Sequence, residues 1–117
     1  MKTIVAAQGE VRVYRIDALP TNLQTRRPEL NKAGAAIISH SESGHHHVIA
    51  GADVMERTDN VPDGMAIFYA IIKDPTRLIQ DAPTPHGSIP LDADSIYEFR
   101  VAREYDPFAD QARRVAD

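Results

Sequence analysis

Short runs of apolar and β-branched residues alternate with turn-forming residues along the chain. Residues 65–72 form the strongest run, apolar at both parities, as is typical of a strand buried on both faces. Residues 95–105 alternate between apolar and polar positions, which predicts a half-buried strand. Its apolar parity holds Tyr97, Phe99 and Val101, and its polar parity holds Glu98, Arg100 and Glu104. These patterns predict one central strand and one long strand with a solvent-facing side.

The other β-like runs are shorter. We predict strands at residues 3–7, 11–19, 33–39, 45–50 and 76–80. Within residues 11–19 the apolar parity changes between Val13 and Tyr14, which either a β-bulge near Val13 or burial on both faces would explain. Six or seven short strands with few or no helices predict an all-β fold, a small barrel or a sandwich.

Polar segments separate these runs. Residues 20–32 and 51–63 are predicted to be loops, with one or two helical turns at residues 52–57 as an alternative. Residues 81–90 hold three prolines and a glycine, too many for a regular element. A final β-hairpin is expected over residues 89–105.

Length and composition indicate one ordinary globular domain. The 117 residues, 43% hydrophobic and 26% charged, are enough for a hydrophobic core. We assign residues 1–106 to a single β domain and residues 107–117 to a charged C-terminal tail. The net charge of −4 argues against a protein that binds the nucleic-acid backbone. Cysteine is absent, which excludes disulfides, thiolate metal ligands and a cysteine nucleophile.

No apolar run has the length of a secretory signal core or a membrane span. We therefore expect a cytoplasmic or virion-associated protein that is not secreted by a signal peptide and has no membrane partner.

The most informative motif is the histidine triplet in residues 44–49, Gly-His-His-His-Val-Ile. On a strand, His45 and His47 would share one face and His46 would point to the other. Two imidazoles on one face suit a divalent metal such as zinc, iron, nickel or manganese. His86 is the leading third ligand. Further candidate ligands are His40, Glu42, Asp53 and Glu56. If the turn at residues 41–44 folds strand onto strand, His40 would be a cross-strand neighbour of His45.

Other chemistry has less support in the sequence. Serines lie near the histidines, but no Gly-x-Ser-x-Gly elbow accompanies them, which disfavours a serine nucleophile. Arg100 and Arg103 could bind an anion or a partner. Arg100 shares its parity with Glu98 and Glu104, however, which favours surface ion pairs worth less than about 1 kcal/mol.

Two segments together resemble a family of small uncharacterised bacterial and phage-encoded β-rich proteins. Residues 44–49 are similar to its Gly-His-x-His-x-Ile motif, and Arg103-Glu104-Tyr105-Asp106-Pro107 is similar to its C-terminal Arg-Glu-Tyr-x-Pro motif. The likeness covers residues 33–117 and implies that His45, His47 and His86 belong to one recurring unit. This chain departs from the pattern by its extra histidine, His46, and by having one histidine near position 86.

The ligand order of cupin-type barrels offers a second, partial resemblance. In those barrels a His-x-His pair is followed by a glutamate and a distant histidine, an order that His45, His47, Glu56 and His86 reproduce. The spacing from His47 to Glu56 is longer here.

We therefore favour a small phage- or mobile-element-type β protein in which His45, His47 and His86 converge on a divalent-metal site. If it is an enzyme, the simplest chemistry is a metal-activated water with Glu42 or Glu56 as base. The alternative is a structural or assembly module without catalytic activity. It would self-associate through sheet edges, because the chain has only three lysines that could block edge-to-edge pairing. A third hypothesis, a binding protein for an anion or small ligand, rests on the arginines of the tail.

Overall fold

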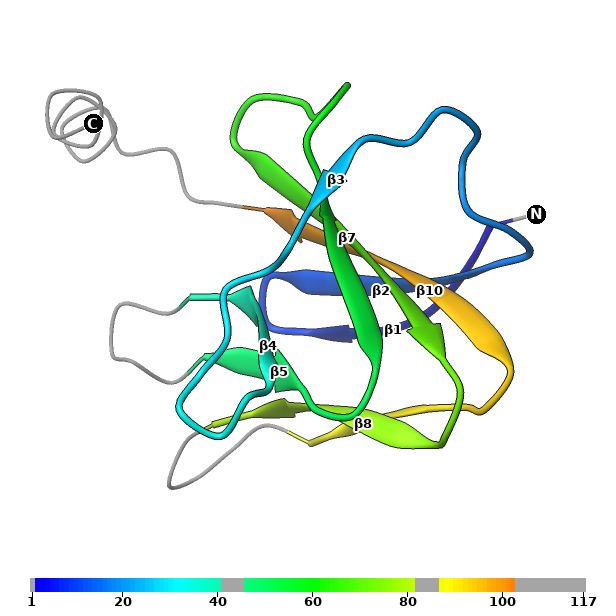
Figure 1. Ribbon diagram of the computed structural model, residues 1–117. Coiled ribbons are helices and arrows are strands. Elements are labelled where there is room, and N and C mark those ends of the chain that lie inside the picture. The colour runs from blue at the N-terminus through cyan, green and yellow to red at the C-terminus, as the bar shows by residue number, and fades with distance from the viewer. Residues whose placement is uncertain (1, 41–45, 82–86, 103–117) are drawn as a thin grey trace, which may run out of the picture.

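The computed structural model describes residues 2–40, 46–81 and 87–102. These residues form ten β-strands in two antiparallel sheets that lie against each other (Figure 1). The predicted all-β fold is confirmed. Because neither sheet closes on itself, the architecture is a sandwich and not a barrel.

The larger sheet has six strands in the order β1-β2-β10-β7-β6-β3. Their bounds are β1 Thr3–Gln8, β2 Val11–Ile16, β10 Ser95–Ala102, β7 Met65–Ile72, β6 Asp53–Arg57 and β3 Thr25–Arg26. The two longest strands, β7 and β10, pair along their whole lengths in the middle of the sheet. The central strand predicted at residues 65–72 is therefore confirmed, and the described part of the long strand predicted at residues 95–105 pairs beside it.

The smaller sheet has four strands in the order β4-β5-β8-β9. Their bounds are β4 Ala36–Ser39, β5 His47–Ile49, β8 Thr76–Gln80 and β9 Ile89–Leu91. The predicted hairpin over residues 89–105 is wrong, because β9 pairs with β8 whereas β10 pairs with β2 and β7. The chain crosses between sheets at residues 92–94, where Asp94 adopts a positive φ of 56°. Pro90 is accommodated because β9 is an edge strand.

The segment predicted as loop or helical turns at residues 51–63 contains a strand instead. β6 pairs with β7, and Val54 on β6 reaches the core. Its apolar signal is weak because charged residues occupy three of its five positions. Hydrogen bonding to the strongly apolar β7 outweighs this weak local preference.

The parity change near Val13 has its explanation in the neighbouring strand. The β1–β2 register shifts between Ile4 and Ala6, opposite Tyr14 and Val13, so the irregularity lies in β1. Val13 faces the core, whereas Tyr14 lies half-buried on the outer face under the cations of Lys2 and Arg100. Val13 therefore lies on the core face of β2, and Tyr14 lies on the outer face, where Lys2 and Arg100 partly cover it.

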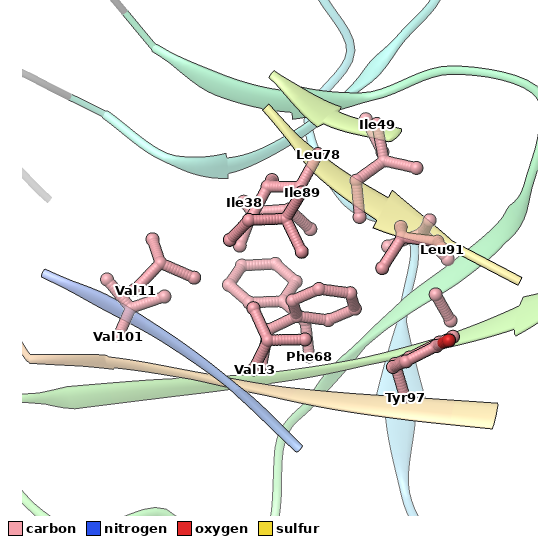
Figure 2. Packing of buried hydrophobic residues seen from close by; sticks show 14 of the residues in the cluster. Val11, Val13, Ile38, Ile49, Phe68, Leu78, Ile89, Leu91, Tyr97 and Val101 are labelled. Carbon is pink, nitrogen blue, oxygen red and sulfur yellow. The ribbon is translucent and has the colours of Figure 1, made fainter. Parts of the chain in front are cut away.

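The core fills the space between the two sheets (Figure 2). Phe68 and Val13 of the large sheet face Leu78, Ile89 and Leu91 of the small sheet. Each such side chain contributes roughly 1.5–3 kcal/mol by leaving water. Within the described residues, no helix is long and apolar enough to cross a membrane.

Candidate functional site

The turn between β1 and β2, Gln8-Gly9-Glu10, encloses the side chain of His47. His47 begins β5 and is only 2% exposed. Its Nδ1 lies 2.6 Å from Gln8 Oε1, and its Nε2 lies 3.6 Å from Glu10 Oε2. Gly9 has a φ of +58°, and a Cβ there would lie 3.4 Å from His47 Cε1 and Nε2. The turn thus contacts the imidazole ring at both nitrogens.

The hydrogen bonds of Gln8 fix the tautomer of His47. Gln8 Nε2 donates to the carbonyl oxygens of Gly87, at 2.9 Å, and Leu78, at 3.3 Å. The amide oxygen must therefore be the atom that faces His47, and it can only accept. His47 Nδ1 carries the proton, so in the neutral ring Nε2 holds the lone pair.

Glu10 faces that lone pair. The Ser39 hydroxyl donates to Glu10 Oε1, while Oε2 is directed toward His47 Nε2. The Glu10 side chain is 36% exposed, so the carboxylate beside the buried histidine is open to solvent. A carboxylate and an imidazole lone pair are both acceptors. Their approach is favourable only if a proton or a metal cation lies between them.

The other described histidines lie next to this site. His46 is half-buried, and its ring packs edge-on against that of His40 with 4.6 Å between centroids. The expected cross-strand neighbour of His40 was His45. The contact is with His46, because Ser39 pairs with His47 in the β4–β5 ladder. His40 Nε2 also lies 2.7 Å from a carboxylate oxygen of Glu29.

The remaining predicted ligands are separated from His47 or lie outside the described residues. Glu56 belongs to β6 of the large sheet, where its carboxylate accepts a 2.8 Å hydrogen bond from Arg26. Asp53 begins the same strand. His45, Glu42 and His86 lie outside the described residues. In the described ranges, no three histidine, aspartate or glutamate side chains are grouped closely enough to hold a metal ion.

Sequence analysis missed Gln8, Glu10 and Ser39. Residues 8–10 lie between the strands predicted at residues 3–7 and 11–19, and the contact between Gln8 and His47 spans 39 positions of the chain. One usable signal was present: two polar residues flank a glycine at the end of an apolar strand. A turn of this kind can direct both side chains at one group.

A second polar network lies on the outer face of the large sheet. Glu98 is 3% exposed, although its parity predicts a solvent-facing residue. It accepts hydrogen bonds from Lys2 Nζ at 2.7 Å, Arg100 Nε at 3.0 Å and the Tyr69 hydroxyl at 3.1 Å. Burial acts to raise the pKa of Glu98, but the hydrogen bonds from Lys2 and Arg100 outweigh it and leave the pKa below its ordinary value. The predicted surface ion pair is therefore part of a buried network.

Tyr69 links this carboxylate to a second arginine. Its hydroxyl donates to Glu98 and accepts a 3.0 Å hydrogen bond from Arg57 Nη1. Burial, with the charge of Glu98, raises the pKa of Tyr69 despite the opposing hydrogen bond from Arg57. The phenol therefore stays neutral and can donate. These side chains line a pocket of about 420 Å³.

The fold and its two networks define a small β-sandwich module with polar sites at the end of one sheet and on the outer face of the other. The chain belongs to the family described as a domain of unknown function (DUF8820), whose model matches residues 7–101. An uncharacterised family was expected from the motifs, and the matched range includes both networks except for Lys2. Comparisons with curated proteins and with solved structures gave no match.

Proposed function

We propose that the protein binds one divalent transition-metal ion through His47 Nε2 and the Glu10 carboxylate. The observation that carries the proposal is the arrangement of His47 between Gln8 and Glu10. A metal-ligating histidine usually donates its other N–H to a carbonyl or carboxylate, and Gln8 Oε1 is such an acceptor. The 3.6 Å between His47 Nε2 and Glu10 Oε2 is close to the roughly 3.3 Å that separates two ligands of a tetrahedral zinc ion.

Two protein ligands are too few for tight binding, and we propose His45 and His86 as the others. Their neighbours in the chain support this. Gly87 accepts a hydrogen bond from the same Gln8 that holds His47, and the Asp81 amide donates to the His46 carbonyl at 2.8 Å. Described residues that flank the segments with the predicted ligands therefore lie near His47. Nitrogen and carboxylate donors suit zinc, iron, nickel or manganese.

The experiment compares metal binding by the untagged protein and three variants, after chelation and dialysis, by calorimetric titration with Zn²⁺. One ion per chain is expected. Glu10→Gln keeps the shape of the side chain and should weaken binding about tenfold or more, and His47→Gln should abolish it. His46→Ala is the control, because it removes a neighbouring imidazole that packs against His40.

Circular dichroism on each variant separates loss of the site from loss of the fold. The proposal is wrong if the folded native protein takes up no zinc, or if His46→Ala loses as much affinity as His47→Gln. A native protein without zinc affinity would leave the proton as the species between His47 and Glu10.

A second candidate function is a self-assembling module, as expected for a phage- or mobile-element-type protein that works in the cytoplasm or in a virion. Ile4 and Val5 on the edge strand β1 favour it, since they are 57% and 47% exposed. A second copy that pairs through β1 would cover both side chains. We expect a dimer by light scattering and a monomer for Val5→Lys. A native monomer at high concentration would refute it.

A further inference from the structure

The pocket on the outer face of the large sheet is independent of the proposed metal site. It lies over the middle strands, where the register places Glu98 between Tyr14 of β2 and Tyr69 of β7. Part of its wall is formed by Ile16, Asp17, Ala18 and Pro20. Its lining charged side chains are Lys2, Arg57, Arg100, Asp17 and Glu98. Cationic groups therefore outnumber anionic ones in this pocket, on a protein whose net charge is −4.

The buried groups of the pocket orient its two arginines. Arg100 is held through Nε by Glu98. Arg57 is held through Nε by the Asp59 carbonyl at 2.8 Å and through Nη1 by Tyr69. A guanidinium carries five N–H donors. Among the described residues, no hydrogen bond is made by either Nη of Arg100 or by Nη2 of Arg57. Both fixed guanidiniums therefore keep donors available at the same pocket.

Burying Glu98 needs compensation. Removing a carboxylate from water costs several kcal/mol, and an apolar residue of similar volume is often equally stable at such a position. Here Lys2, Arg100 and Tyr69 together offset the cost. The arrangement also fixes the planar guanidinium of Arg100 beside a cavity of about 420 Å³. Fixed planar donors of this kind suit the oxygen pairs of phosphate and carboxylate groups.

We infer that this pocket binds a small oxyanion, the phosphate or carboxylate group of a low-molecular-weight ligand. Arg57 and Arg100 contact the anion, and Lys2 adds a third positive charge. Glu98 and Tyr69 act as positioning residues, because Glu98 accepts a hydrogen bond from Arg100 and Tyr69 accepts one from Arg57. A pocket of this size holds more than the anionic group, so the ligand extends along the apolar wall formed by Ile16, Ala18 and Pro20.

The test is a titration of the full-length ¹⁵N-labelled protein with inorganic phosphate and, separately, with acetate, followed by NMR. The Nε–Hε signals of Arg57 and Arg100 report directly on the two guanidiniums. We expect these signals to shift saturably with at least one of the anions, and the preferred anion distinguishes a phosphate source from a carboxylate source. Sodium chloride at equal ionic strength is the control for screening.

Substitutions separate a specific site from general charge. Arg57→Lys keeps the charge and loses the planar donors, and we expect it to weaken binding about tenfold or more. Arg77→Lys is the matched control, because Arg77 is an exposed arginine of β8 bonded to Ser88. It should bind like the native protein. The inference is overturned if chloride reproduces the shifts, or if both variants bind equally well while remaining folded. Because no residue of the metal site changes, zinc binding should be the same in both variants.

Discussion

Replacing Gln8 by Met tests the buried network directly. The substitution keeps the volume and removes three hydrogen bonds: one from His47 Nδ1 and two to the carbonyls of Leu78 and Gly87. Gln8 is buried, so water cannot readily replace the amide. An unsatisfied buried N–H costs about 1–3 kcal/mol, and the two carbonyls add about 1 kcal/mol. Burial of the apolar methionine side chain offsets part of this cost. We expect a net loss of about 2–4 kcal/mol in the free energy of unfolding.

The assay is urea unfolding followed by far-ultraviolet circular dichroism, in the presence of a chelator so that metal makes no contribution. Gln24→Met is the control, because Gln24 is exposed and its hydrogen bonds to other described residues involve only its backbone. It should change stability by less than about 0.5 kcal/mol. If Gln8→Met unfolds at the same urea concentration as the control, the account of the Gln8 network is wrong.

The same position separates stability from metal binding. Gln8→Glu still accepts the Nδ1 proton of His47 but can no longer donate to Leu78 and Gly87. We expect Gln8→Glu to lose stability and keep its zinc affinity, whereas Gln8→Met should lose both, with affinity falling about 10–100-fold. Equal zinc affinity in Gln8→Met and the native protein would contradict the tautomer argument.

Two further substitutions probe the two networks. Gly9→Ala should lower the free energy of unfolding by about 1 kcal/mol because of the positive φ, and should also weaken zinc binding because the added Cβ contacts His47. Gly51→Ala is the control, since Gly51 has a similar φ of +68° but an added Cβ would have no atom within 4 Å, so only the backbone cost should appear. Equal zinc affinities in the two variants would refute the contact. Because the folded-state pKa of Glu98 is lowered, the stability that its carboxylate provides is complete above the ordinary pKa of 4.5 and is lost as the pH falls through the folded-state pKa. Urea unfolding of Glu98→Gln between neutral and acidic pH should therefore show a smaller loss of unfolding free energy with acid than the native protein does. Equal dependence of unfolding free energy on pH in the two proteins would contradict this.

The sequence predicts a strand well when the strand's own pattern of apolar and polar residues indicates which of its faces are buried. β7 is apolar at both parities and lies between β10 and β6 with both faces covered. The strand β6 could not be predicted, because its residues are mostly charged and its place depends on pairing with β7. The partner of β9 was also misassigned: sequence proximity favoured β10, but the apolar residues Ile89 and Leu91 face the core from the small sheet.

The candidate sites show a similar limit. The histidine triplet lies in the segment that contains the buried His47. Which of the three histidines is buried depends on the β4–β5 register, and the amino-acid composition does not determine that register. Glu98 was predicted to face solvent because alternation identifies two faces of a strand without showing what covers the second. Here Lys2, Arg100 and Tyr69 form hydrogen bonds to Glu98 on that second face.

Strand β1 connects the two networks, although it contributes little to the core. It is an edge strand on which Ile4 and Val5 are exposed, and Ala6 is the residue that packs against the core cluster. Its attachment depends on the ladder with β2 and on polar contacts near its ends: Lys2 with Glu98, and Gln8 with His47. Edge strands held by few apolar contacts open more readily than central ones. A metal at His47 or an anion beside Lys2 would each favour the docked form of β1. Binding at either site should therefore also stabilise the edge at which a second copy would pair.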